Sequence, residues 1–284
     1  MEKQMNEKWT TIIKSKSGWF DINFKELFKY KDLILLFVKR NYITRYKQTI
    51  LGPLWLILNP LITVILYSVV FGNIAGLSTE GSPQLVFYMA SNSIWSYFAL
   101  CLTQTSNTFS GNAAILGKVY FPRLTMPISA VLTGLLDLGI QTLMLLITLS
   151  VYALQGIQIN ISKSVVMIPF LIIQVALLGL GVGIIISSLT TKYRDLVIVV
   201  TFGVQLWMYA SPVVYSVSQI PPRYMNIYML NPMAPIITCW RHAFIGTGEF
   251  PVAYWMISWC ITLFLLIIGV VLFNKIEKTF MDTV

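Results

Sequence analysis

Long uncharged stretches alternate with short charged ones along this 284-residue chain. No Asp, Glu, Lys or Arg occurs in residues 48–79, 81–117, 138–162, 164–191, 196–222 and 250–274. Each stretch can hold the roughly 20 apolar residues that cross the core of a bilayer as a helix. Because a segment inside the membrane must satisfy its own backbone hydrogen bonds, the pattern predicts an all-α integral membrane protein.

These stretches predict six transmembrane helices. Their expected ranges are 51–73, 86–108, 124–154, 165–189, 196–216 and 251–273. The third is longer than a bilayer requires, so we expect an interfacial turn before Pro127 near its start. The chain then divides into an N-terminal tail with an interface helix, residues 1–50, and a six-span domain, residues 51–284.

The distribution of positive charge predicts the orientation. The chain is 56% hydrophobic and 11% charged, whereas soluble domains carry about 25% charged residues. With a cytoplasmic N-terminus, the inside segments hold 17 Lys and Arg (11, 2, 2 and 2 in chain order) and the outside loops hold three, Lys163, Arg223 and Arg241. The positive-inside rule therefore predicts that both termini are cytoplasmic. Eleven basic residues beside the first span indicate contact with lipid head groups rather than nucleic acid.

An amphipathic helix is predicted just before the first span. Apolar residues recur at helical spacing between lysines over 22–42, and Asp21 is placed to cap the helix. Such a helix lies in the membrane interface. It either anchors the topology alone or also braces a cytoplasmic partner. Residues 1–20 are polar and do not have the form of a cleavable signal.

The loop of residues 217–250 is unusually apolar and is interrupted by prolines. Residues 233–245 are predicted to form a short helix that dips back into the outer leaflet. Backbone at that depth must be hydrogen bonded within a helix or buried in protein, so short re-entrant helices are expected. The alternative is an interfacial loop that only packs against the spans.

Side chains for enzymatic chemistry are scarce. His242 is the only histidine and has no acidic or histidine neighbour with which to bind a metal. Cys101, Cys239 and Cys260 lack paired spacing and are interpreted as apolar residues. Residues 111–119 resemble a phosphate-binding loop, but five residues separate the glycines and valine follows the lysine. We therefore expect any ATP hydrolysis to occur on another chain.

Asp137 is the only acid inside a predicted span. An intramembrane carboxylate is a candidate for function, and a proton-coupled carrier would require one. The structural alternative is a hydrogen-bonded packing residue near Gly134 and Gly139.

The connection of residues 109–123 is longer than a tight turn between two spans requires. It can form one short helix that Pro122 ends, presenting Ile115, Lys118 and Tyr120 to a groove of a partner. The alternative is an interfacial turn without a partner.

Aromatic residues make up 13% of the chain. Many are expected in interfacial belts or against lipid. Tyr67 and Phe71, one turn apart on the first span, are instead candidates to line a pathway. Aromatic rings with a polar edge suit sugars, whose C–H faces are apolar while their hydroxyls need partners.

Three stretches taken together resemble a known family. They are RNYITRYKQTILGPLWLILNPLIT, SYFALCLTQTSNTFSGNAAILGKVYFPR and the terminal EKTFMDTV. The combination of Arg45-Tyr46, Leu51-Gly52-Pro53 with Trp55, and residues 118–123 resembles the permease subunit of type-2 ABC exporters. The likeness runs from about residue 30 to the C-terminus and is greatest to the O-antigen and polysaccharide exporters of bacteria.

The resemblance implies a homodimer that binds two copies of a separate cytoplasmic ATPase, which would hold ATP and Mg. The chain itself would be no enzyme and hold no cofactor. The complex would export undecaprenyl-diphosphate-linked glycans across the bacterial cytoplasmic (inner) membrane. Teichoic-acid and capsule exporters share this architecture. In other classes, a proton-coupled carrier would show an inverted repeat, and a membrane glycosyl- or lipid-transferase would show clustered acids or a metal site. The sequence shows neither.

The same resemblance assigns roles along the chain. Residues 22–42 would be the interface helix, 109–123 would carry the ATPase-coupling helix, and 222–246 would form outer gate helices, while the first and fifth spans line a channel. The expected coupling residues are Asn112, Ile115, Lys118, Tyr120, Phe121 and Arg123. The expected channel-lining aromatics are Tyr67, Phe71, Trp207, Tyr209 and Tyr215. The expected outer gate residues are Tyr228, Asn231, Pro232 and Trp240.

Three basic residues, Arg40, Arg45 and Lys47, lie where a lipid diphosphate would arrive at the cytoplasmic face. Cations at head-group depth suit a pyrophosphate. The alternative is that they only hold the interface helix at the membrane surface.

Overall fold

The computed structural model describes residues 24–47, 49–108, 111–112, 121–157, 161–190 and 196–283. In these residues all regular secondary structure is helical, and no strand occurs. Five helical segments are long and apolar enough to cross a membrane. They are Gly52–Ile74, Gln84–Ser106, Thr125–Leu154, Lys163–Thr190 and Val252–Lys275. The predicted all-α fold is confirmed, and five of the six predicted spans agree with these segments to within a few residues.

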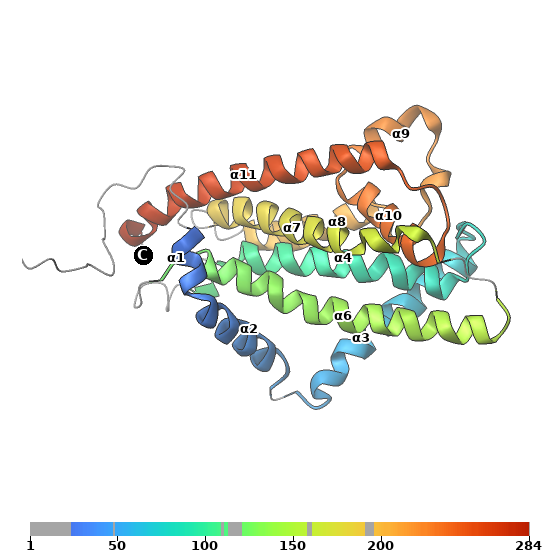
Figure 1. Ribbon diagram of the computed structural model, residues 1–284, viewed down its shortest axis with the longest axis horizontal. Coiled ribbons are helices and arrows are strands. Elements are labelled where there is room, and N and C mark those ends of the chain that lie inside the picture. The colour runs from blue at the N-terminus through green and yellow to red at the C-terminus, as the bar shows by residue number, and fades with distance from the viewer. Residues whose placement is uncertain are drawn as a thin grey trace, which may run out of the picture.

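The bundle is built around α4 (Gln84–Ser106). In the most apolar part of this helix, 78% of the residues are buried inside the protein. On one side α4 packs against α6 (Thr125–Leu154), and on the other against α7 (Ile168–Thr190). The outer face of α7 is covered by α11 (Val252–Thr283). Figure 1 shows α11, α7, α4 and α6 running side by side in this order. Because lipid is as apolar as the side chains, close packing rather than hydrophobicity must hold such helices together.

Glycines on two faces of α7 explain this close packing. A Cβ atom on Gly179 or Gly183 would lie 2.6 Å from the Cβ of Cys101 or Thr105 on α4. On the opposite face, Gly181 lies directly against the backbone of α11. Small residues of this kind let helix backbones approach one another within a membrane. The alternation therefore fixes α7 as the middle layer between α4 and α11.

Helices occupy the range predicted for the interface helix, although they are divided and extend further than expected, and their place in a membrane interface stays a prediction. They are α1 (Phe24–Lys29) and α2 (Lys31–Tyr46), separated by a turn at Tyr30. Their apolar contact is made chiefly by Phe37, which is buried against the start of the α6 segment.

The first span begins at a sharp joint. Gly52 adopts a φ of 51°, a left-handed conformation that favours glycine, and Pro53 follows in η1 (Gly52–Leu54). The helix continues as α3 (Trp55–Tyr67) and widens into the π-helical segment η2 (Ser68–Ile74). Wide turns of this type occur frequently at functional sites.

The predicted fifth span, 196–216, is shorter in the structure. α8 (Leu196–Tyr209) has 14 residues and so rises about 21 Å, less than the roughly 30 Å of a bilayer core. The chain then turns at Ser211, whose N–H bonds to the Met208 carbonyl, and Pro212 cannot continue a helix. The end predicted for this span is therefore wrong by seven residues.

Short helices fill the loop after α8, as predicted. They are η4 (Val217–Gln219), α9 (Pro222–Met229) and α10 (Met233–Ile245), and α10 spans the residues expected of it. Almost every residue of α10 is buried against the bundle, and Gly246 ends it with a φ of 71°. Figure 1 places α9 and α10 at the opposite end of the bundle from α1 and the C-terminus. Whether they re-enter a membrane stays a prediction.

Candidate functional site

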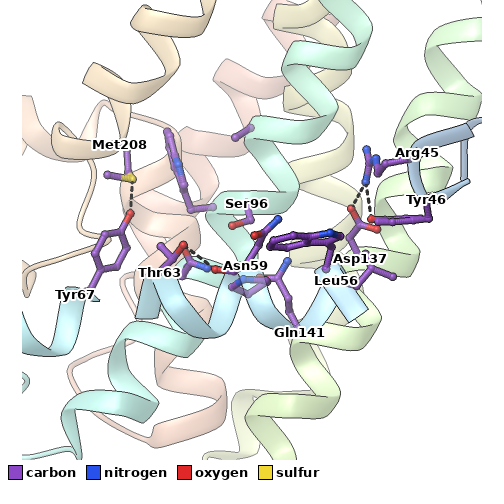
Figure 2. A pocket seen from close by; sticks show the side chains of 15 residues that line it. Arg45, Tyr46, Leu56, Asn59, Thr63, Tyr67, Ser96, Asp137, Gln141 and Met208 are labelled. Atoms are coloured by element: carbon purple, nitrogen blue, oxygen red, sulfur yellow. Dashed lines mark hydrogen bonds and ion pairs between the residues drawn. The ribbon is translucent and has the colours of Figure 1, made fainter. Parts of the chain in front are cut away.

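An open cavity of about 580 Å³ lies between α3, α4 and α6. Figure 2 shows Arg45 and Tyr46 of α2 at one end, and Tyr67 of α3 with Met208 of α8 at the other. Polar side chains from all three helices lie between these ends. The cavity therefore follows α3 from the end of the interface helix to α8, and it unites residues that the sequence placed in separate sites.

Arg45 and Asp137 form an ion pair at the α2 end of the cavity. Arg45 Nη1 donates a hydrogen bond to Asp137 Oδ2 over 2.5 Å and lies 3.5 Å from the hydroxyl of Tyr46. The two side chains are 28% and 12% exposed, so the pair is largely withdrawn from solvent. The structural alternative for Asp137 was a hydrogen-bonded packing residue near Gly134 and Gly139, with no partner named. The partner comes from α2, 92 residues earlier.

The other two residues predicted to receive the diphosphate lie outside the cavity. Arg40 Nη2 donates to Asn112 Oδ1 over 3.3 Å, and the guanidinium lies 4.8 Å from the ring centre of Phe37. Lys47 is exposed directly after the end of α2. Of the three basic residues, Arg45 is thus the one that lines the cavity.

The predicted ATPase-coupling residues divide into three groups. Asn112 holds Arg40 of the interface helix, as described above. Phe121 and Arg123 are buried, and the ring of Phe121 lies 5.6 Å from that of Phe37. Ile115, Lys118 and Tyr120 lie outside the described residues. The described part of the connection therefore contacts α2 directly.

Tyr67 closes the α8 end of the cavity. Its hydroxyl donates to the sulfur of Met208 over 3.2 Å, which joins the first span to α8. Phe71 packs edge-on against Tyr67 with ring centres 5.8 Å apart, at the start of the π-helical segment. This contact brings together the two aromatic residues that were predicted to line a pathway, although Tyr67 alone of the two lines this cavity.

A second cavity of about 380 Å³ lies where α8 meets α9 and α10. Trp207, predicted to line a channel, shares its wall with Tyr228, Asn231 and Pro232, predicted to form an outer gate. Trp207 Nε1 donates to Asn231 Oδ1 over 2.9 Å, and Asn231 Nδ2 donates to the Ala210 carbonyl over 2.9 Å. Asn231 therefore fixes the joint between α9 and α10 to the end of α8.

A chain of tyrosines continues from this joint. The Tyr228 hydroxyl donates to the Tyr215 hydroxyl over 3.1 Å, and the latter donates to the Tyr209 carbonyl over 3.0 Å. Burial raises the pKa of Tyr228, so its hydroxyl remains a neutral donor. Trp240, by contrast, is wholly buried in the bundle and donates to Ser93 Oγ of α4 over 3.2 Å. Its indole therefore holds α10 to α4.

Arg241 is a residue whose importance the sequence did not reveal. It was counted as an outer positive charge, yet it is 2% exposed and donates to the Pro212 and Tyr215 carbonyls over 3.0 and 3.2 Å. Its guanidinium lies 4.3 Å from the ring centre of Phe87. Burial lowers the pKa of Arg241 to about 10, although Glu80 opposes the shift, so the residue stays charged near neutral pH. The sequence feature that could have indicated its burial is the position of this arginine within the largely apolar residues 233–245.

Among the described residues, no three His, Cys, Asp or Glu side chains form a group that could hold a metal ion. His242 bonds instead to Ser162 Oγ over 3.1 Å and to the Gly248 carbonyl over 3.1 Å. Most of the segment 111–119 lies outside the described residues, so the exclusion of a phosphate-binding loop there stays a prediction.

The sequence of this chain is similar to a known transporter family and to several membrane permeases. A family model described as ABC-2 type transporter matches residues 32–245. An O-antigen export system permease protein of Klebsiella pneumoniae is 30% identical over 251 residues, which cover 88% of this chain and 94% of that protein. A protein of the same description from Myxococcus xanthus is 26% identical, covering 78% and 83% of the two chains. An inner membrane transport permease of Escherichia coli is 22% identical, covering 70% and 84%.

Proposed function

Because the chain belongs to the ABC-2 type transporter family, we propose that it is the membrane subunit of an ATP-driven exporter of undecaprenyl-diphosphate-linked polysaccharide, similar to O-antigen. The family membership confirms the resemblance found in the sequence, and the five span-length helices make the chain a multi-pass membrane protein. We choose this cargo because the chain is similar to O-antigen export permeases over most of its own length and of theirs.

The lipid diphosphate would be received at the end of α2, on the cytoplasmic side of the inner membrane. Lys47 is exposed there, and Arg45 lies at the mouth of the larger cavity. Guanidinium groups bind phosphate oxygens through paired hydrogen bonds. The arriving diphosphate would compete with Asp137 for Arg45, so binding would loosen the contact between α2 and α6.

Energy would come from two copies of an ATPase bound to a homodimer of this chain, with ATP and Mg on the ATPase. The coupling segment 109–123 would dock on it through Ile115, Lys118 and Tyr120. The hydrogen bond from Arg40 to Asn112 and the contact of Phe37 with Phe121 support a path from that segment to α2. Phe121 and Arg123, which are buried, would transmit the movement rather than touch the partner.

The glycan would then pass along the first and fifth spans. Tyr67, Phe71, Trp207, Tyr209 and Tyr215 would supply aromatic surfaces to sugar rings. The joint at Asn231 and Pro232, with Tyr228 beside it, would act as the outer gate because it connects α9 and α10 to the end of α8. Trp240 would serve this gate by anchoring α10.

Other functions fit the same observations less well. Teichoic-acid or capsule glycans remain alternative cargoes for this architecture. A proton-coupled carrier would use Asp137, but protonation would leave the largely buried Arg45 without its counter-charge. No observation favours a transferase.

The test is reconstitution of this chain with its ATPase in lipid vesicles. Under the proposal, the two proteins co-purify, and ATP hydrolysis rises when undecaprenyl-diphosphate-linked glycan is added. The matched comparison is undecaprenyl phosphate without glycan. A stable complex that hydrolyses ATP equally with and without the glycan lipid would argue for a different cargo, and absence of a complex would overturn the proposal.

A further inference from the structure

Six polar side chains line the larger cavity in three pairs, and the members of each pair are four residues apart on one helix. The pairs are Asn59 and Thr63 on α3, Asn92 and Ser96 on α4, and Asp137 and Gln141 on α6. Side chains four residues apart lie on the same face of a helix. Three helices therefore turn polar side chains towards one space within the bundle (Figure 2).

Several of these groups are buried without a hydrogen bond. Among the described residues, Gln141 Oε1 and Asp137 Oδ1 have no partner. The Asn92 side chain, 4% exposed, lines the same cavity. Buried polar groups in native proteins are nearly always paired, since leaving one unpaired costs free energy. Polar residues inside a membrane bundle mark sites where a substrate or water passes or binds.

The chemistry of the cavity defines its ligand. The two unpaired atoms are oxygens, so a ligand that pairs with them must donate hydrogen bonds. The charge of Asp137 is balanced by Arg45, and no other Asp, Glu, Lys, Arg or His is among the described residues that line the cavity, so the ligand is uncharged where it meets Gln141. Trp55 and Trp95 add apolar surface. A hydroxylated ring with apolar C–H faces, that is a sugar, meets all these conditions.

We propose that this cavity binds the sugar residue next to the diphosphate of the lipid-linked glycan. The identity of the carrier rests on the proposed function. The volume of about 580 Å³ is typical of pockets for small organic molecules. Arg45 at the α2 end would hold a diphosphate oxygen, while ring hydroxyls donate to Gln141 and exchange hydrogen bonds with the amide of Asn92. The chain would thereby recognise the first sugar before the rest of the glycan moves.

The experiment measures binding of two lipids to the complex of this chain and its ATPase in nanodiscs, by native mass spectrometry. One lipid is a polyprenyl diphosphate carrying a single N-acetylhexosamine, and the other lacks the sugar. The sugar-bearing lipid is expected to bind about tenfold more tightly, the gain that one or two added hydrogen bonds give. Gln141→Met, which keeps the volume but removes the amide, is expected to abolish most of this preference.

The matched control is Gln155→Met, the same substitution at an exposed position just beyond the end of the same helix. It should keep the full preference. Asn92→Leu is a second cavity variant expected to behave like Gln141→Met.

Because Gln141 Oε1 has no partner in the chain, Gln141→Met should unfold at the same temperature as the wild type or higher. A residue with a purely structural role would lower that temperature.

Three results would overturn the sugar site. They are equal affinity of the wild type for both lipids, an intact preference in both cavity variants, and a preference lost equally in Gln155→Met. Binding of neither lipid would instead show that the proposed function is wrong, and the sugar site with it. The two failures are therefore distinguishable.

Discussion

Arg45 at the end of the interface helix is bonded to Asp137 in the middle of the third span, with 2.5 Å between Nη1 and Oδ2. The pair joins α2, which lies beside the bundle, to α6 within it. Since α2 also contacts the connection of residues 109–123 through the bond from Arg40 to Asn112, that connection and the cavity are linked by a single helix.

Removing the carboxylate tests this pair. Asp137→Asn is expected to lower the free energy of unfolding by about 1–2 kcal/mol, because Arg45 is left unpaired in a largely buried position. Thermal unfolding of the purified transporter measures the change. The exchanged pair, Arg45→Asp with Asp137→Arg, should regain part of the loss, and a double-mutant cycle without coupling would show that the contact is unimportant.

The bond between Arg40 and Asn112 predicts a loss of coupling. Under the proposed function, Arg40→Ala should keep ATP hydrolysis but reduce glycan export severalfold, because α2 no longer follows the coupling connection. Lys39→Ala, at the exposed neighbouring position, is the control and should export normally. Equal export by both variants would contradict the path.

The contact of α7 with α4 predicts a strong effect at one glycine. Gly183→Ala would place a Cβ 2.6 Å from Thr105 Cβ and 2.9 Å from the Leu102 carbonyl oxygen, so the two helices must separate. We expect a loss of about 2–4 kcal/mol from overpacking. Gly139→Ala on α6 meets no atom within 4 Å and should be neutral or stabilising by up to about 1 kcal/mol. Similar unfolding temperatures for the two variants would disprove the role of the close approach.

Arg241 predicts a second large effect, at the other end of the molecule. Arg241→Met should cost about 2–4 kcal/mol, because the buried carbonyls of Pro212 and Tyr215 lose their donor. Arg223→Met, at an exposed position on α9, should cost less than about 0.5 kcal/mol. The measurement is thermal unfolding, and limited proteolysis should show earlier cleavage of the segment after α8 in Arg241→Met. Unchanged protection of that segment would contradict the role assigned to Arg241.

The spans were predictable because the absence of charge is a local property of the sequence. The end of α8 was not, since it depends on Pro212 and on Asn231, whose side chain reaches back 21 residues to the Ala210 carbonyl. Arg45 and Asp137 were each recognised as candidates, but nothing local shows that residues 92 positions apart form a pair.

The missed features share a physical cause. The burial of Arg241 depends on a ring in α4 and on carbonyls in a turn, and none of these is adjacent in sequence. The three polar pairs of the cavity are visible in the sequence at four-residue spacing. Their convergence is not, because it depends on how α3, α4 and α6 are rotated against one another.

The burial of α10 has a consequence for how the protein is made. This helix is enclosed by α4, α7 and α11, and α11 is the last of them to leave the ribosome. Until α11 inserts, α10 lacks the contacts that it makes with α11. The packing around α10 must therefore be completed last during biosynthesis. Chains truncated before Val252 would leave the surfaces of α7 and α10 that contact α11 uncovered, and proteases that degrade incompletely folded membrane proteins could recognise them.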